Sequence, residues 1–342
     1  MENLKISFFH RKRDNFMWSI EKLFADLRRQ LLSQFDHIVY EAPCASQGFW
    51  FRLKNIRWAC RHQGTINHIT GDIHYIALGL PGKNTILTIH DLGFMQQYKG
   101  IYRWLLWLFW IYLPVRRVKW VVAISEATKK EILRYSHCSP EKIKVIPNFI
   151  SPNIVAAQKE FNPIQPVILQ MGTKFNKNLE RLVVALKGIN CKLLIVGHLS
   201  AEQVALLQEN RIVFENRFNL TDEQIINVYR ECDLLCFCSL LEGFGLPILE
   251  AQATGRPVIT SNLSSMPEVA QDAACLVDPY SIESIREGIQ KVINHPEYCD
   301  SLIRKGFENV KRFSLANVAD QYAALYKEVY RSNQKNKGQA TS

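Results

Sequence analysis

Short apolar runs alternate with amphipathic stretches along the chain, and this alternation predicts an α/β protein. Apolar runs of about four to eight residues are typical of buried parallel strands, and apolar positions three or four residues apart are typical of helices. In the first half of the chain this pattern predicts strands at residues 4–9, 37–40, 65–69, 84–89, 120–124 and 142–146, and helices at 16–32 and from Glu126.

A second series follows residues 151–165, whose prolines and polar residues predict an interdomain linker. Its predicted strands are residues 166–171, 191–196, 211–214, 233–238, 257–260 and 274–277. Its predicted helices are residues 178–188, 200–209, 221–231, 281–293, 297–311 and 315–331. The polar residues 332–342 predict a disordered tail.

The chain of 342 residues is long enough to form two hydrophobic cores. Repeated strand–helix units predict parallel sheets with helices on both faces. We therefore expect two doubly wound, Rossmann-like domains, at residues 1–150 and 166–314, with ligands at the carboxyl ends of their strands. Those two edges would face one another across a cleft.

The segment after the predicted strand 233–238 is the strongest candidate for a binding site. Gly243 and Gly245 lie in a loop, Pro247 suits the first position of a helix, and Gly255 suits its end. The unpaired N–H groups and the dipole of a helix N-terminus attract anions, and glycines let a phosphate approach the backbone. The segment therefore predicts an anion site.

Two glutamates bracket this loop: Glu242 precedes it, and we expect Glu250 in the first turn of the helix. Carboxylates are poor phosphate ligands but good acceptors for hydroxyl groups. The combination predicts a ligand with both phosphates and hydroxyls, such as a nucleotide sugar. From spacing alone, a solvated loop whose helical glutamate only favours the dipole is the alternative.

The segment from Glu242 to Glu250 resembles the E-x7-E signature of the group 1 (family 4) nucleotide-sugar glycosyltransferases. Similar flanking residues extend the match: Asp222-Glu223, Tyr229, the strand 233–238, Gly255-Arg256-Pro257-Val258-Ile259 and Pro267-Glu268-Val269. The resemblance implies a GT-B fold whose last helix, 315–331, crosses back to the first domain. It also implies retention of anomeric configuration and no cofactor or metal at the diphosphate, and the sequence contains no Asp-x-Asp metal motif.

The same resemblance implies which residues bind the donor. Gly172, Thr173 and Lys177 follow a predicted strand, where the family usually has Gly-Arg and then a lysine, both cations facing the diphosphate. Thr173 stands where the family usually has arginine, and Lys174 could supply that positive charge instead. The alternative interpretation of the segment is a basic helix start with no ligand. The signature segment completes the donor site. The resemblance implies that Glu250 binds the ribose hydroxyls and that the backbone N–H groups of Gly243, Phe244, Gly245 and Leu246 bind the diphosphate.

His90-Asp91 follows the predicted strand 84–89 and resembles the family motif whose histidine contacts the donor sugar. We expect His90 and Glu242 to act on the sugar, and Asp91 to hold the loop. Taken alone, a histidine at a strand end is more often a hydrogen-bonded structural residue. Ser125 suits the N-cap of the following helix and also matches the family's next loop on the acceptor side.

The first loop departs from the family. Many members have a glycine pair after the first strand, but here His10 is followed by Arg11, Lys12 and Arg13. Arg11 and Arg13 are therefore predicted to face an anionic acceptor, such as a phosphate-linked lipid carrier. A flexible basic turn is the alternative.

Positive charge is concentrated in the first half: residues 1–150 contain 22 Lys+Arg and 11 Asp+Glu, whereas residues 151–342 contain 20 and 21. This surplus favours an anionic membrane surface, with a basic surface that only aids solubility as the alternative. No DNA- or RNA-binding motif accompanies the charge, so nucleic acid is not predicted as a partner. Residues 101–120 contain an apolar run too short to span a bilayer, which predicts either a core helix or an interfacial one.

The nine cysteines show no spacing typical of a disulfide framework or a zinc site, so we expect reduced thiols. The first residues run almost directly into a strand and lack signal-peptide features. Together these features predict a cytoplasmic protein, peripheral on the inner face of the plasma membrane if its basic domain binds lipid.

These features predict a retaining, metal-independent glycosyltransferase. It would move a sugar from a nucleotide diphosphate sugar to the hydroxyl of a glycan or lipid-linked acceptor, in bacterial surface polysaccharide assembly. Two alternatives stay open. One is a nucleotide-sugar 2-epimerase on the same architecture. The other is a non-catalytic nucleotide-binding partner at the membrane, favoured by Thr173 and by the missing first-loop glycines.

Overall fold

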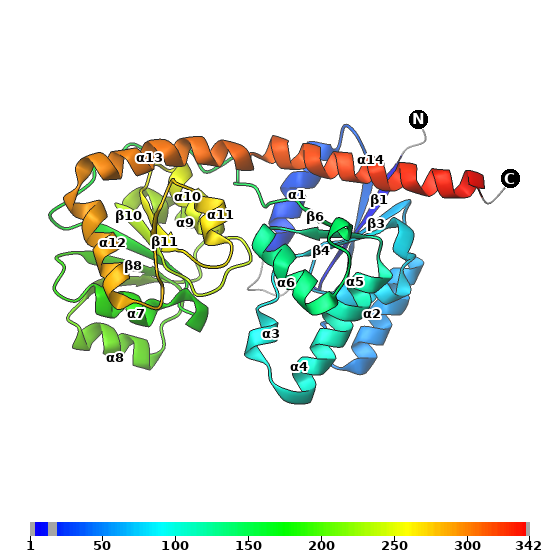
Figure 1. Ribbon diagram of the computed structural model, residues 1–342, viewed down its shortest axis with the longest axis horizontal. Helices are drawn as coiled ribbons and strands as arrows, with labels where there is room; N and C mark the ends of the chain where they lie inside the picture. The colour runs from blue at the N-terminus through cyan, green and yellow to red at the C-terminus, as the bar shows by residue number, and fades with distance from the viewer. Residues whose placement is uncertain (1–3, 13–18, 340–342) are drawn as a thin grey trace. The chain divides into compact units, whose positions relative to one another are not determined.

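The computed structural model describes residues 4–12 and 19–339, which form two compact units (Figure 1). Unit 1 comprises Met1–Phe149 and Leu315–Ser342, and unit 2 comprises Ile150–Ser314. The C-terminal segment therefore belongs to the same unit as the N-terminal half of the chain.

Unit 1 is built on a parallel sheet of six strands in the order β2-β1-β3-β4-β5-β6. The strands are β1 Lys5–His10, β2 Asp36–Glu41, β3 Ile66–Ile69, β4 Thr85–Ile89, β5 Trp120–Ala123 and β6 Ile143–Val145. The helices are α1 Ser19–Leu31, α2 Phe49–Arg61, η1 His74–Gly79, η2 Gly82–Asn84, α3 Phe94–Gln97, α4 Gly100–Leu106, η3 Trp107–Tyr112, α5 Leu113–Arg117, α6 Glu126–Ser136, η4 Pro140–Lys142 and α14 Leu315–Gln339.

Neighbouring residues of each buried strand serve opposite faces of this sheet, because strand side chains alternate in direction. Phe9 of β1 and Leu87 of β4 pack in a cluster with α2, η1, η3 and α6. Phe8 and Ile86, one position earlier, pack in a second cluster with α1 and α14. Both faces of the sheet are thus covered by helices, as in a doubly wound fold.

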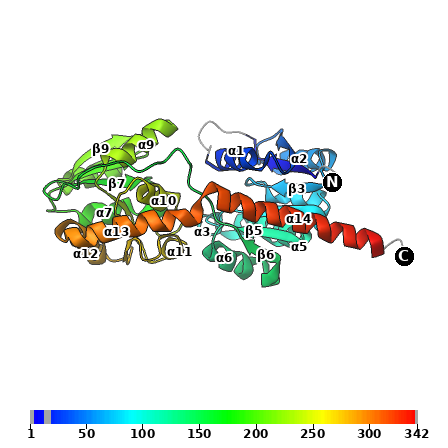
Figure 2. The same cartoon turned by 90° about the horizontal axis from the view of Figure 1, so that it is seen from above.

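Helix α14 completes the second face of unit 1: it lies along the top of the unit in Figure 1 and over the middle of the sheet in Figure 2. Val318, Tyr322, Tyr326 and Val329 are spaced at helical intervals and are at most 2% exposed. The hydroxyl of Tyr326 lies 2.8 Å from Nδ1 of the buried His68. These contacts bind the end of the chain to β3.

The predicted tail differs from the structure, because α14 continues past residue 331 to Gln339. Lysine and glutamine propagate an existing helix readily, and extending a helix costs much less free energy than starting one. Of the predicted tail, only residues 340–342 lie outside the described residues.

Unit 2 is also built on six parallel strands, in the order β12-β11-β10-β7-β8-β9. The strands are β7 Val167–Met171, β8 Lys192–Val196, β9 Val213–Arg217, β10 Leu234–Phe237, β11 Val258–Ser261 and β12 Cys275–Val277. The helices are η5 Phe175–Lys177, α7 Leu179–Ala185, α8 Ala201–Glu209, α9 Asp222–Glu231, α10 Leu246–Ala253, α11 Met266–Ala270, α12 Ile282–Asn294, α13 Pro296–Val310 and η6 Lys311–Phe313.

The strand order of unit 2 reverses direction between β7 and β10. From β7 the chain builds outward through β8 to β9, and then returns to place β10 on the other side of β7. In open parallel sheets, ligands bind in the crevice at the carboxyl ends of the two strands that flank such a reversal. The topology therefore locates the candidate site of unit 2 at the loops that follow β7 and β10.

The apolar stretch at residues 101–120 forms a continuous helix with a π-helical middle, α4–η3–α5. Its second part is core, since Leu106, Trp110, Ile111 and Val115 are buried. Its first part, with Ile101, Tyr102, Trp104 and Leu105, is exposed, so the prediction of a core helix is confirmed for the second part alone. Within residues 4–12 and 19–339, no helix is both long and apolar enough to cross a bilayer.

Candidate functional site

The loops after β7 and β10 are fastened to each other at the carboxyl edge of unit 2. The backbone N–H of Leu240 donates to the Asn176 carbonyl at 2.8 Å, and the Asn176 amide donates to the Leu241 carbonyl at 3.0 Å. The buried amide of Asn178 donates to the Cys238 carbonyl at 3.0 Å. The two loops that flank the topological reversal therefore form one polar surface.

Lys177 and Glu242 meet on this surface. The Lys177 ammonium donates to Oε1 of Glu242 at 2.6 Å and lies 4.7 Å from the centre of the Phe237 ring. Both side chains are at most 20% exposed, so solvent screens the pair only in part. The structure thus brings together a cation and a carboxylate that are 65 residues apart in the chain.

Gly172 provides the space for Lys177. It has a φ of 90°, and a Cβ at this position would lie 2.9 Å from Cγ of Lys177. Thr173, the position where the family usually has arginine, donates its hydroxyl to the His198 carbonyl at 2.5 Å. Lys174 is exposed. Thr173 is therefore engaged in holding the loop, and Lys177 is the cation that the fold positions at the crevice.

The signature loop enters α10 through Gly245, whose φ of 106° is accessible mainly to glycine. Two serines after β11 hold this loop, and neither was predicted. Ser264 donates to the Glu242 carbonyl at 2.7 Å, and Ser265 donates to the Phe244 carbonyl at the same distance. These two serines fix the backbone of the signature loop. No motif in the sequence around them predicts this role.

Glu250 lies in the second turn of α10 and not in the first, because the helix already begins at Leu246. Its Oε2 accepts a hydrogen bond of 2.6 Å from the hydroxyl of Tyr229, which is fully buried. Burial, together with the adjacent carboxylate, raises the pKa of Tyr229 well above its usual value. Tyr229 therefore remains a protonated donor that orients Glu250.

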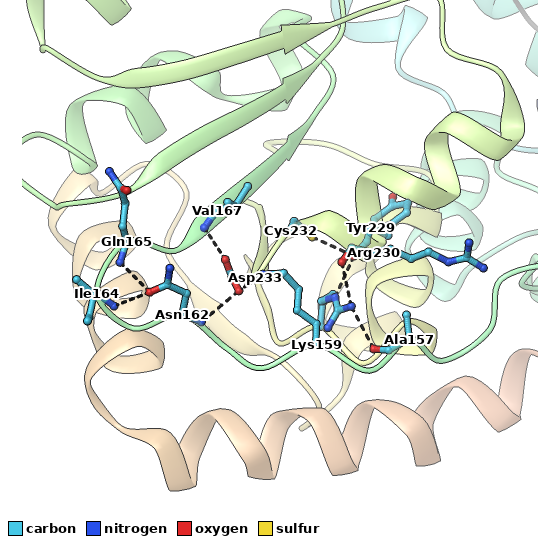
Figure 3. A network of polar contacts seen from close by, with 11 residues as sticks. Ala157, Lys159, Asn162, Ile164, Gln165, Val167, Tyr229, Arg230, Cys232 and Asp233 are labelled. Atoms are coloured by element: carbon cyan, nitrogen blue, oxygen red, sulfur yellow. Dashed lines mark hydrogen bonds and ion pairs between the residues drawn. The ribbon is translucent and has the colours of Figure 1, made fainter.

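Tyr229 is itself held by a buried arginine. The guanidinium of Arg256 is engaged by backbone carbonyls, donating to those of Tyr229 at 2.9 Å, Ala157 at 3.1 Å and Arg230 at 3.2 Å. Figure 3 shows these carbonyls converging at the end of α9. Arg256 follows α10 in the chain, so one residue couples that helix to the segment that orients Glu250.

The same network attaches the interdomain linker to unit 2 through Asp233, whose side chain is 1% exposed (Figure 3). Asp233 forms an ion pair with Lys159 and accepts N–H groups of Asn162 at 3.2 Å and Val167 at 2.8 Å. Because Asp233 precedes β10 and Val167 begins β7, these bonds align the amino ends of the two strands that carry the site at their other ends.

In unit 1, His90 follows β4 at the carboxyl edge of the sheet. Its Nε2 lies 2.9 Å from the Thr70 carbonyl, which can only accept, so Nε2 carries the proton. Burial lowers the pKa of His90 below its usual value, and the ring is therefore neutral at pH 7. Nδ1 of this tautomer is an acceptor. The carboxylate of Asp91 accepts the Gly93 N–H at 3.0 Å, as predicted for a residue that holds the loop.

Thr70 also positions a histidine that the sequence did not single out as functional. His10 ends β1 and is 4% exposed. Its Nε2 accepts from Arg28 at 2.9 Å, and its Nδ1 lies 3.1 Å from the Thr70 hydroxyl, which in turn donates to the Phe9 carbonyl at 3.2 Å. Because a guanidinium only donates, this chain fixes His10 as a neutral ring.

The predicted acceptor residues of unit 1 have mixed outcomes. Arg11 forms an ion pair of 2.9 Å with Glu21, so its charge is already partly compensated. Arg13 lies outside the described residues. Ser125 is fully buried and accepts the Thr128 N–H at 2.9 Å, which makes it the N-cap of α6 and removes it from any exposed acceptor surface. The prediction of the N-cap is confirmed.

Comparisons with known proteins match this chain to two glycosyltransferase families. Residues 154–309 match the family Glycosyl transferases group 1, and residues 41–154 match Glycosyltransferase Family 4. The serotype-specific mannosyltransferase WbdA of Escherichia coli is 25% identical over 249 residues, covering 65% of this chain and 30% of that protein. The O-antigen chain mannosyltransferase RfbU of Salmonella typhimurium is 24% identical over 244 residues, covering 67% of this chain and 68% of that protein.

The chain spans less than a third of the length of the first curated relatives that it matches. Among solved structures, sucrose-phosphate synthase from Thermosynechococcus elongatus has a TM-score of 0.79 at 16% identity, covering 96% of this chain and 100% of that chain. Together with the two parallel sheets, this similarity confirms the predicted fold class.

Proposed function

Because this chain belongs to the group 1 glycosyltransferases of family 4 and has their GT-B fold, we propose that it transfers a sugar from a nucleotide diphosphate sugar to an acceptor hydroxyl. The relatives named above are mannosyltransferases, one of the O-antigen chain. The name of the second supports surface polysaccharide assembly, and we extend the proposal to a glycan or lipid-linked acceptor at the inner face of the plasma membrane. Mannose is the first donor sugar to test.

The observation that carries this proposal is the Lys177–Glu242 pair at the topological reversal of unit 2. A carboxylate beside a diphosphate would repel it, but the ammonium 2.6 Å away compensates that charge. Lys177 can then contact the phosphates while Glu242 accepts a sugar hydroxyl. Glu250, oriented by Tyr229, would accept the ribose hydroxyls.

Glycosyl transfer breaks the bond between the sugar and the β-phosphate, and negative charge develops on the departing phosphate. Lys177 and the backbone N–H groups of residues 243–246 would stabilise that charge as it forms. We propose that no metal is needed, since these groups supply the compensation and the sequence has no Asp-x-Asp motif. The acceptor hydroxyl would attack from the leaving-group side and give its proton to the departing phosphate, with retention at the anomeric carbon.

His90 is proposed to contact the donor sugar through Nδ1. Because Nε2 donates to Thr70, Nδ1 can accept from a sugar hydroxyl but cannot donate to one. Binding of the sugar hydroxyl therefore requires the neutral form of His90, and burial favours that form because it lowers the pKa of the ring.

A donor screen tests the proposal. Nucleoside diphosphates and their sugar conjugates are titrated by calorimetry against the wild type, Lys177→Met and Glu242→Gln. We expect Lys177→Met to weaken diphosphate binding and Glu242→Gln to weaken only the sugar conjugate. Product analysis by NMR with an acceptor should show the donor's anomeric configuration. Equal binding by all three proteins would refute the site.

The two alternatives have distinct outcomes in the same experiment. A 2-epimerase would convert the nucleotide sugar with no acceptor present. A non-catalytic partner would bind the nucleotide without turnover across acceptors. The second alternative has one structural argument, because the Thr173 hydroxyl is bound to the His198 carbonyl and supplies no charge to the diphosphate.

A further inference from the structure

Unit 1 exposes two groups of large apolar side chains at the starts of two helices. We call them together the aromatic patch: Phe49, Trp50 and Phe51 of α2, and Ile101, Tyr102, Trp104 and Leu105 of α4. Trp50 is 77% exposed and Ile101 is 72% exposed. Exposed apolar groups that gather on one face mark interaction surfaces in soluble proteins.

Topology places both groups at one edge and on one face of the sheet. Helix α2 follows the carboxyl end of β2, and α4 follows that of β4, and parallel strands end at the same edge. Side chains of α2 and of the α4–η3 helix pack in the same hydrophobic cluster, and the Arg52 guanidinium lies 4.7 Å from the centre of the Trp110 ring. Three strand spacings separate β2 from β4, about 14 Å. Figure 1 shows α4 at the lower end of unit 1.

The two helices that carry the aromatic patch are basic, although the exposed carboxylates Glu41, Asp72 and Asp91 lie at the carboxyl ends of β2, β3 and β4. Residues 42–71 contain four Lys+Arg and no Asp or Glu, and residues 92–125 contain five Lys+Arg and no Asp or Glu. Lys54, Arg57 and Arg103 are exposed on the two helices themselves. Helices that combine Trp, Tyr and Phe with Lys and Arg, and contain no carboxylates themselves, complement the headgroup region of an anionic bilayer.

We propose that the aromatic patch docks unit 1 onto an anionic lipid surface. The aromatic side chains would insert at the level of the headgroups and the cations would pair with lipid phosphates, with no segment crossing the membrane. The same sheet edge carries His10 and His90, so docking would bring that edge to the bilayer. This last consequence rests on the proposed function, since it matters only if the acceptor is attached to a lipid.

Co-sedimentation with sucrose-loaded vesicles tests the docking surface without any sugar substrate. Vesicles of phosphatidylcholine alone are compared with vesicles that contain phosphatidylglycerol as well. We expect the wild type to bind the anionic vesicles, and raised salt to weaken that binding. The double variant Trp50→Ala/Trp104→Ala should bind about tenfold more weakly or worse. Leu32→Ala is the matched control, because Leu32 is 61% exposed at the end of α1, on the other face of the sheet.

The charge contribution is tested separately. Lys54→Gln/Arg57→Gln/Arg103→Gln should weaken binding to anionic vesicles, whereas Lys187→Gln/Arg211→Gln/Arg304→Gln removes the same charge from unit 2 and should not. All these residues are exposed, so circular dichroism should show unchanged folding.

Two outcomes would overturn the proposal. One is wild-type binding that the Trp50→Ala/Trp104→Ala variant retains. The other is absence of wild-type binding to the anionic vesicles. A dimer in analytical ultracentrifugation that the same variant abolishes would then show that a second copy covers the patch. Nucleotide binding by unit 2 is measured in parallel, so loss of docking and failure of the proposed function are distinguishable.

Discussion

Replacement of Tyr229 by phenylalanine isolates the orientation of Glu250. The ring stays in its buried position and the backbone carbonyl still accepts from Arg256, so only the 2.6 Å hydrogen bond to Glu250 is lost. A hydrogen bond to a charged group contributes about 1.5–3 kcal/mol. Glu250 is only partly buried, so water can replace part of the interaction. We therefore expect the free energy of unfolding to fall by about 1–2 kcal/mol.

Nucleotide affinity should fall as well, because an unoriented Glu250 must be ordered when the ribose binds. A loss of about 1 kcal/mol corresponds to about a fivefold increase in Kd. The measurement is calorimetry with a nucleoside diphosphate on the wild type, Tyr229→Phe, Glu250→Ala and the double variant. Residues in direct contact should show a coupling free energy of about 0.5–3 kcal/mol in such a cycle.

Tyr280→Phe is the control, since Tyr280 lies in unit 2 but is 59% exposed. The raised pKa of Tyr229 adds a further check: its hydroxyl keeps its proton throughout the neutral range, so the effect should not change between about pH 6 and pH 9. A coupling free energy near zero, with Kd unchanged in Tyr229→Phe, would refute the assignment of Glu250 to the ribose and of Tyr229 to its positioning.

Three further predictions concern the support of the site. Gly172→Ala should weaken diphosphate binding and cost about 1–2 kcal/mol of stability, because it strains a positive φ and displaces Lys177. Gly188→Ala is the control: its φ is 78° and no atom lies within 4 Å of the added Cβ, so it strains the backbone alone and should leave the Kd for the diphosphate unchanged. Asp233→Asn should lower the free energy of unfolding in urea by about 2–4 kcal/mol. Asp272→Asn, which loses an exposed ion pair with Lys305, should leave it nearly unchanged. Burial lowers the pKa of His68 well below 6.5, so on acidification the unfolded chain gains a proton there that the folded chain does not. The free energy of unfolding should therefore fall below about pH 6.5, by up to about 1.4 kcal/mol per pH unit. His68→Gln should reduce that slope in urea titrations, and an unchanged slope would contradict the prediction.

Buried strands were predictable because both faces of each sheet are covered by helices. The predicted strand 233–238 corresponds to β10, Leu234–Phe237, and the helix predicted at 221–231 corresponds to α9, Asp222–Glu231. In such a sheet most positions of a central strand such as β10 are apolar, and the run is distinct from its polar flanks. Local composition is therefore sufficient for these elements.

Helix α2 was not predicted, and its burial pattern explains why. The buried positions of α2 are Asn55 and Ala59, whereas Phe49, Trp50 and Phe51 are exposed. Asn55 is satisfied by the Cys44 backbone and by the Tyr75 hydroxyl, 2.8 Å away. Apolar periodicity locates a helix only when the apolar side is the buried side.

The candidate site was predictable where a residue type carries the chemistry. Lys177 and Glu242 were both identified, although their direct contact required the strand order of unit 2. Ser264, Ser265 and Thr70 were not identified, because their roles depend on carbonyls in loops that are distant in the sequence. Single hydroxyl groups leave no periodic or spacing signal.

The position of α14 in unit 1 has a consequence for synthesis on the ribosome. Unit 2 is continuous in sequence, Ile150–Ser314, whereas unit 1 needs Leu315 onward to cover Phe8, Ile66 and Ile86. During translation, unit 1 emerges first but exposes that apolar face until the whole of unit 2 has been made. The nascent chain therefore completes its second domain before its first, and chaperones have a defined apolar face to bind in the interval.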